Sequence, residues 1–114
     1  IGILYQLLGE TSMGIRHWMD WYTDRTQYAD WYLTLSPERL LACDEELVRI
    51  LYAQSDGLQN ALRCGMPVEE KTITRYLHTA QTARLRLQQC GSRYTRLIDE
   101  LTAPFNGTEE DTIH

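Results

Sequence analysis

The four residues Cys64-Gly65-Met66-Pro67 divide the chain into segments that we expect to be helical. Glycine readily takes the left-handed conformation that closes a helix C-terminus, and proline fits the first turn of the next helix. A second start is predicted at Ser36-Pro37-Glu38, where the serine can accept a hydrogen bond from a free backbone N–H. The dipeptide Ala103-Pro104 predicts the end of a third helix.

Between these breaks, apolar residues recur at spacings of three and four, which places them on one face of a helix. The helices are therefore predicted over residues 2–34, 37–64 and 67–102. Gly9, Gly14 and Gly91 are each expected to weaken their helix by about 1 kcal/mol relative to alanine, so residues 1–9 can also form a separate turn. The third segment has the most regular pattern, with no charged residue at its apolar positions, which are Ile73, Tyr76, Ala80, Ala83, Leu87, Cys90, Tyr94, Leu97 and Leu101.

No segment shows the sustained alternation of a strand, and the connections between segments are short. The predicted fold is therefore all-α, an elongated antiparallel three-helix bundle with coiled-coil-like heptad seams. Its core is expected to include Trp18, Tyr22, Ile73, Tyr76, Leu87, Tyr94 and Leu97. We expect one domain over residues 1–104, followed by an acidic flexible tail over residues 105–114.

The charge distribution excludes several classes of partner. The net charge is −5, and Glu109, Glu110 and Asp111 supply −3 of it, so residues 1–104 are nearly neutral. Such a surface has no basic face for nucleic acid or anionic lipid. No apolar run reaches the roughly 18–20 residues of a membrane span.

The cysteines indicate a reducing compartment. There are three, an odd number without a CxxC pair, whereas a disulfide framework needs an even set. We therefore expect a cytoplasmic protein, with Cys90 in the core and Cys64 the most exposed thiol. The triplet Asn106-Gly107-Thr108 is a glycosylation sequon and favours a secreted protein instead, but no signal peptide is visible. Because the chain begins with isoleucine, we expect it to come from a longer protein.

Two stretches carry a resemblance to a known family. "RHWMDWYTDR", residues 16–25, has Trp18 on its apolar face. "RLRLQQCGSRYTRLIDEL", residues 84–101, contains a basic residue, an aromatic residue, two further residues and a leucine, at residues 93–97. With three helices in just over 100 residues, the chain resembles a spectrin-type repeat, including the divergent repeats of plakins. Such repeats often place a core tryptophan on the first helix, and Tyr94 stands where their closing pattern usually has tryptophan. The resemblance covers most of residues 12–102 and implies a scaffold module of the cytoskeleton, membrane skeleton or a cell junction, without enzymatic activity.

The most unusual stretch is "HWMDWYTDRTQYADWY", residues 17–32, which holds six of the eleven aromatic residues. At about 100° per residue, Trp21, Tyr28 and Trp31 lie roughly 60° to 140° to one side of Trp18 on a helix. They form a second line beside the apolar face, and a single bundle seam needs an arc only a little over about 100° wide.

We name this second line the aromatic flank, and it consists of His17, Trp21, Asp24, Tyr28 and Trp31. Exposed tryptophan and tyrosine are typical of the centres of protein interfaces, so the flank is a candidate partner-binding surface. Two structural alternatives remain open. Residues 1–9 can fold back over the flank, or the wide aromatic arc can fill a corner where the bundle splays.

The sequence contains no pattern typical of a catalytic, cofactor or metal site. His17, Asp20 and Asp24 share one helical face but are too few to hold a metal without ligands from elsewhere. The carboxylates of residues 44–46 have no predicted pocket, and Asp44 is expected to lie on a seam where Arg25 is a candidate partner.

We therefore predict a non-enzymatic interaction module from a larger intracellular protein, with no cofactor, that binds a protein partner or an adjoining repeat through the aromatic flank. The alternative is a homo-oligomeric structural or viral protein whose helices pair between chains. A third hypothesis is a secreted helical ligand, which only the glycosylation sequon supports.

Overall fold

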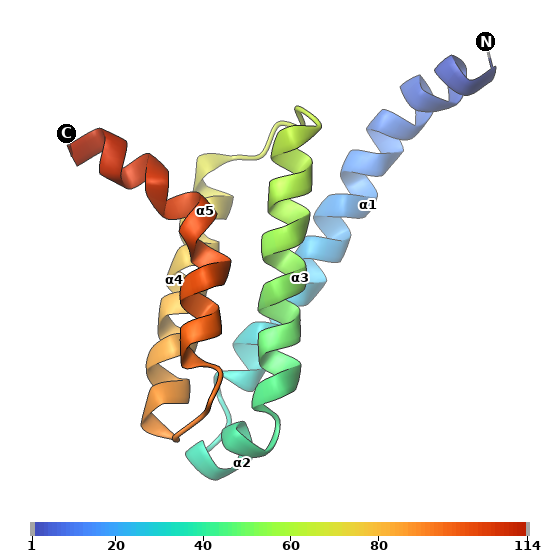
Figure 1. The fold of residues 1–114 in the computed structure, drawn as a ribbon. Coiled ribbons are helices and arrows are strands. Elements are labelled where there is room, and N and C mark those ends of the chain that lie inside the picture. The colour runs from blue at the N-terminus through green and yellow to red at the C-terminus, as the bar shows by residue number, and fades with distance from the viewer. Residues whose placement is uncertain (1, 114) are drawn as a thin grey trace.

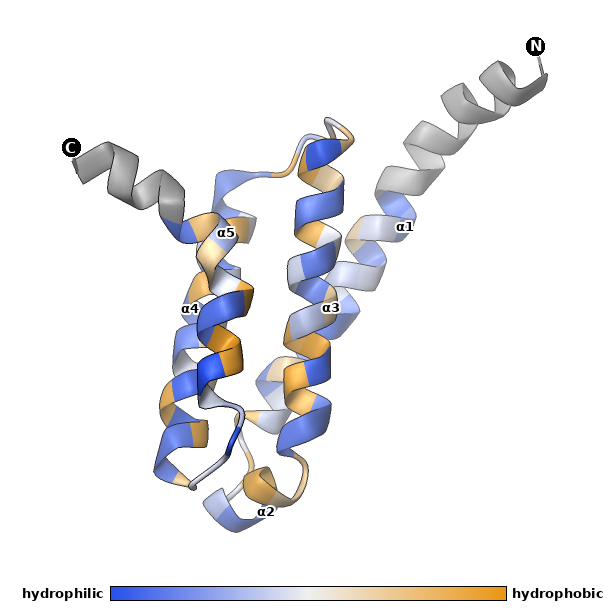
Figure 2. Ribbon diagram, viewed as in Figure 1, coloured by the Kyte–Doolittle hydropathy of each residue, from blue (hydrophilic) through white to orange (hydrophobic). Residues whose placement is uncertain are grey.

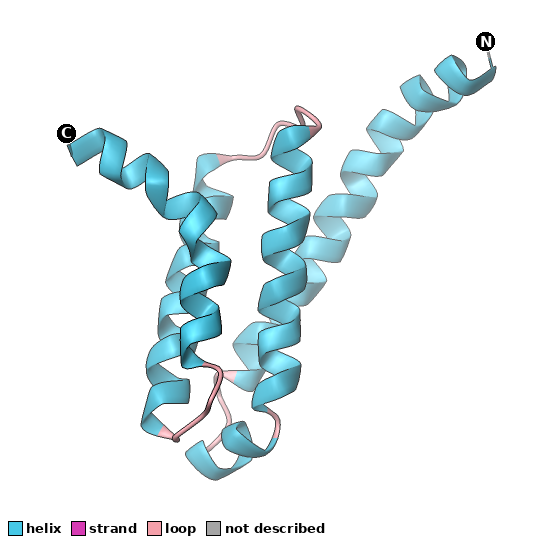
Figure 3. Cartoon of the chain, viewed as in Figure 1, coloured by secondary structure: helices cyan, strands magenta, loops and turns pink. Residues whose placement is uncertain are grey.

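The computed structural model confirms an all-α fold, because the part of the chain that it describes contains helices and no strand. It describes the backbone of residues 2–113 and the side chains of residues 16–106. The helices are α1 (Gly2–Tyr32), α2 (Pro37–Ala42), α3 (Asp44–Arg63), α4 (Glu70–Gln89) and α5 (Thr95–Ile113). Figure 3 shows the short loops that join them.

The four long helices alternate in direction, and α2 forms a short cross-connection at one end (Figure 1). α3 packs against α1 on one side and α5 on the other, while α4 packs against α5 and contacts α2. Hydrophobic (orange) and hydrophilic (blue) patches recur along α3, α4 and the coloured part of α5 in Figure 2, as in helices with an apolar and a polar face.

The single helix predicted over residues 67–102 is wrong, because the chain reverses direction between α4 and α5. With four long helices, the structure does not confirm the predicted three-helix bundle. Gly91 has a φ of 80°. Its N–H donates to the Gln88 carbonyl at 3.2 Å, and the N–H of Ser92 donates to the Leu87 carbonyl at 2.9 Å. This pair of bonds is a Schellman motif, which ends a helix. Gly91 is therefore a helix stop, and the regular apolar spacing across it concealed that role.

The helix stop predicted at Gly65 is confirmed and uses the same geometry. Gly65 has a φ of 75°, its N–H donates to Leu62 at 3.1 Å, and the N–H of Met66 donates to Ala61 at 2.9 Å. The start at Ser36 is also confirmed, since its side chain accepts a bond from the N–H of Arg39. The next helix starts at Glu70 instead of Pro67, with extended backbone at Glu69.

The second predicted helix, over residues 37–64, is divided at Cys43 into α2 and α3. Cys43 leaves the helical conformation, with φ −126° and ψ 25°, and its N–H donates to the Leu40 carbonyl. Asp44 then begins α3. The expected pairing of Asp44 with Arg25 is wrong, because the Asp44 carboxylate accepts a bond from the Ser92 hydroxyl at 2.7 Å. Arg25 neighbours Thr26, which contacts Gln54; ten residues of helix, about 15 Å, separate that level from Asp44.

The helix end predicted at Pro104 is wrong, since α5 includes Pro104 and continues to Ile113. Proline removes one helical hydrogen bond, but the next residue offsets that cost by burial. The Phe105 side chain is 5% exposed, and its ring meets Tyr76 edge-on with centroids 5.7 Å apart. The acidic residues 109–111 of the predicted tail lie outside the described side chains.

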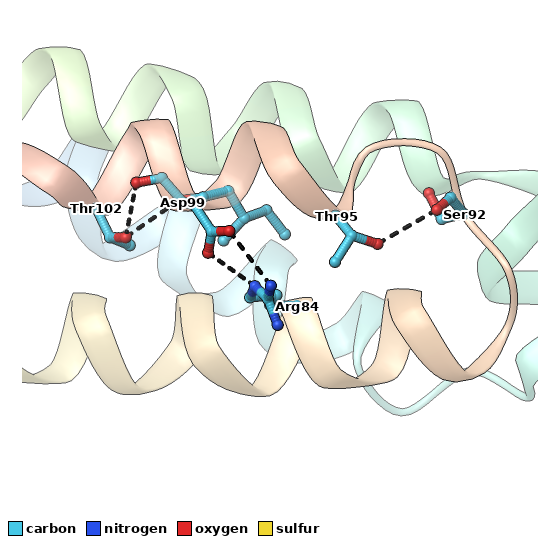
Figure 4. A network of polar contacts seen from close by, with 6 residues as sticks. Arg84, Ser92, Thr95, Asp99 and Thr102 are labelled. Atoms are coloured by element: carbon cyan, nitrogen blue, oxygen red, sulfur yellow. Dashed lines mark hydrogen bonds and ion pairs between the residues drawn. The ribbon is translucent and has the colours of Figure 1, made fainter.

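Three of the predicted core residues, Tyr22, Tyr76 and Leu87, are buried. The other four pack partly buried against the same core; they are Trp18, Ile73, Tyr94 and Leu97. Figure 4 shows the polar contact that joins α4 to α5 at the surface, where the Arg84 guanidinium donates to both carboxylate oxygens of Asp99, at 2.7 and 3.3 Å.

We predict that Arg86→Met lowers the free energy of unfolding by about 1–3 kcal/mol, because two carbonyl groups lose their donor. The Arg86 guanidinium donates to the carbonyls of Leu33 and Leu35, which joins α4 to the chain just after α1. Urea unfolding followed by circular dichroism measures the loss. Arg84→Met is the matched control on the same helix, and its exposed ion pair should contribute less than about 1 kcal/mol. Equal losses for the two variants would contradict the role of Arg86.

We also predict that the fold weakens in alkali. Burial raises the pKa of both Tyr22 and Tyr76 well above the usual value of about 10. Because the folded pKa is the higher one, this contribution to stability is complete below about pH 10 and is lost as the pH rises towards the folded values. Urea unfolding at a series of pH values should show this decline. The double variant Tyr22→Phe/Tyr76→Phe should reduce the slope, and an unchanged slope would contradict the assignment.

Candidate protein-binding surface

The aromatic flank divides into an exposed part and a packed part. His17, Asp24, Tyr28 and Trp31 are exposed on α1, whereas Trp21 is half-buried. The exposed fractions of the Tyr28 and Trp31 side chains are both 57%. Their exposure fits the prediction of a second line beside the core-facing side of α1.

Trp21 differs because its ring lies against Gly57 of α3. A methyl group added to Gly57 would come within 2.7 Å of the six-membered part of the Trp21 indole and within 3.5 Å of the Trp18 ring nitrogen. Glycine at this position therefore allows the two helices to approach with tryptophan rings between them. The sequence shows both residues but not that they meet, because their contact depends on the packing of α1 on α3.

The packed aromatic rings continue towards the core. Trp18 stacks on Tyr22 with ring centroids 5.1 Å apart, and Trp21 lies tilted to Tyr22 at 6.4 Å. The Arg25 guanidinium covers the Trp21 ring at 5.4 Å from its centroid. Trp21 is thus enclosed by Gly57 and Arg25, which limits what it can offer to a partner.

Tyr28 and Trp31 lie outside this arrangement. The Trp31 ring meets Tyr32 edge-on at 5.1 Å, and Tyr32 packs against the core. A shallow depression beside them is lined by Asp24, Gln27, Tyr28, Trp31 and Tyr32, all from α1. One helix alone therefore presents an aromatic surface with a carboxylate at its edge.

Sequence reasoning did not include Asp20 in the flank, although it is one turn from Asp24 and exposed. Neither carboxylate makes an ion pair with another residue whose side chain the structure describes. The spacing in the sequence could have placed Asp20 on this surface, because Asp20 and Asp24 are four residues apart and therefore share a face of the helix.

The side chains described within residues 16–106 include potential metal ligands and three cysteines. No group of three histidine, cysteine, aspartate or glutamate side chains among these residues is placed to hold a metal ion. The three cysteines are free thiols, and Cys64 is exposed while Cys43 and Cys90 are half-buried, as predicted for Cys64. Burial, more than the neighbouring carboxylates, raises the pKa of the Cys43 thiol, which disfavours the reactive thiolate.

No protein-family model matches the chain, and no curated protein or solved structure is significantly similar to it. None of the described helices has the length and apolar character needed to cross a membrane.

We predict that the two flank tryptophans differ in their effect on stability. Trp21→Ala removes the ring packed on Gly57 and should lower the free energy of unfolding by about 2 kcal/mol. Trp31→Ala removes a mostly exposed ring and should change it by less than about 0.5 kcal/mol. Chemical unfolding of the two single variants measures the difference. A large loss for Trp31→Ala would show that its ring is part of the core.

Proposed function

We propose that this chain is a non-enzymatic interaction module, a scaffold or adaptor segment of a larger intracellular protein, that binds a protein partner through the exposed part of the aromatic flank. The observation that carries the proposal is the exposure of Tyr28 and Trp31, side by side on α1, while the core closes without them. Large aromatic side chains are enriched at the centres of protein interfaces, where their burial contributes much of the binding energy.

The place of such a module in a cytoskeletal or junctional scaffold rests on the sequence resemblance of residues 16–25 and 84–101 to spectrin-type repeats. The four long helices of the structure are one more than such a three-helix repeat has. The interaction role does not depend on that resemblance, because the flank lies within one helix, α1, whichever family the other helices belong to.

The alternative is a homo-oligomer in which the flank pairs with a second copy of the chain. Exposed apolar side chains also occur elsewhere, including Leu41 and Tyr52, and support self-association in general without favouring the flank. Light scattering over a range of concentrations separates the two functions. A constant mass near 13.3 kDa is expected for a module that binds a different protein.

The double variant Tyr28→Ala/Trp31→Ala tests the proposed function. We expect it to keep the helical content and stability of the parent chain but to lose its partners in quantitative affinity capture from cell extract. The matched control is Tyr52→Ala/Leu85→Ala, whose side chains are 58% and 56% exposed on α3 and α4. The control should retain the same proteins. Equal loss by both variants, or no loss by the first, would show that the flank is not the binding surface.

A further inference from the structure

We propose that the occupant of the aromatic flank is a cationic amphipathic helix of the partner protein, held by the exposed rings of Tyr28 and Trp31 and by the carboxylates of Asp20 and Asp24. This inference rests on the proposed function and adds the chemistry of the partner. It follows from the charge and the shape of the surface around the two rings.

The charge of this surface is mainly negative. Residues 16–31 contain three aspartates and two arginines. Arg16 lies one turn before Asp20, and the Arg25 guanidinium lies over the Trp21 ring instead of beside the exposed pair. Asp30 is paired with Arg75 of α4 at 3.1 Å, which leaves Asp20 and Asp24 as the unpaired carboxylates of α1 among the described side chains.

A carboxylate of α3 adds to this negative charge. Asp56 lines a crevice with Trp18 and Trp21 between α1 and α3. Cations complement both features of this surface, because they pair with carboxylates and are attracted to the faces of tryptophan and tyrosine rings.

The same charges disfavour a second copy as the occupant. A symmetric pair uses the same surface on both chains. If two copies of α1 ran antiparallel about the middle of residues 17–31, Asp24 would face Asp24 of the other copy. If they ran parallel, Asp20 and Asp24 would each lie beside their own equivalents. Like charges set against each other across an interface weaken it and select against that partner.

The shape of the exposed surface of α1 favours a helical partner. The exposed residues from His17 to Trp31 follow one side of α1 for about 21 Å, at 1.5 Å per residue. A second helix can lie along such a line, with an apolar stripe on Tyr28 and Trp31 and its basic residues towards Asp20 and Asp24. Arginine suits this position best, because its planar group can both stack on a ring and pair with a carboxylate.

Two synthetic helical peptides with the same apolar stripe test the inference, one with lysine and arginine on its polar face and one with glutamate. Titration calorimetry with the full chain measures both dissociation constants. We expect the cationic peptide to bind, with weaker binding at higher salt, and the anionic peptide not to bind. The double variant Asp20→Asn/Asp24→Asn should raise the dissociation constant of the cationic peptide on the order of tenfold.

The matched control is Glu38→Gln/Glu100→Gln, which removes the same charge from exposed positions on α2 and α5 and should leave binding unchanged. Equal binding of the two peptides, both lost in Tyr28→Ala/Trp31→Ala, would overturn the charge inference while supporting the flank as a binding surface. No binding of either peptide, or an equal effect of the two carboxylate variants, would also overturn it. The capture experiment tests the proposed function separately, since it uses no assumption about the partner's charge.

Discussion

Three residues within two turns of α3 make buried or partly buried hydrogen bonds to three different helices. The Gln54 amide donates to the Thr26 hydroxyl of α1 at 2.9 Å, and the Ser55 hydroxyl donates to the Leu101 carbonyl of α5 at 2.8 Å. The Leu51 carbonyl accepts from the Tyr76 hydroxyl of α4 at 2.7 Å. A buried polar group without a partner costs more than the bond contributes, so sliding any helix along α3 would be penalised. These bonds therefore set the height of α1, α4 and α5 relative to α3.

The orientation of the aromatic flank depends on that arrangement. With Thr26 held at Gln54, α1 turns Tyr22 and Ala29 into the core and brings Trp21 onto Gly57. Tyr28 and Trp31 then fall outside the contact with α3. The same helix thus supplies part of the core and an exposed aromatic pair, and it also carries the exposed carboxylates of Asp20 and Asp24.

The helix ends were predictable where two local signals agreed. Cys64-Gly65 is followed by a proline, and both the left-handed glycine and the break were expected. Cys90-Gly91 has the same backbone geometry without a nearby proline, and the apolar spacing continues across it. Periodicity over residues 73–101 therefore predicted one helix where the structure has two. At Pro104 the sequence predicted a helix end where the helix continues. The burial of Phe105 against Tyr76 outweighs the hydrogen bond that proline removes.

The sequence by itself determined that the chain is helical, where α2 begins, where α3 ends, and that one side of α1 carries more aromatic residues than a core needs. These properties depend on spacing and on backbone groups within a few residues, which the order of amino acids specifies directly. Only the tertiary structure decided which of the aromatic residues are free. Trp21 and Trp31 are alike in sequence, but a glycine 36 positions after Trp21 admits its ring between two helices, and no such site receives Trp31. That difference arises from the distance between α1 and α3, which the packing of the whole bundle sets.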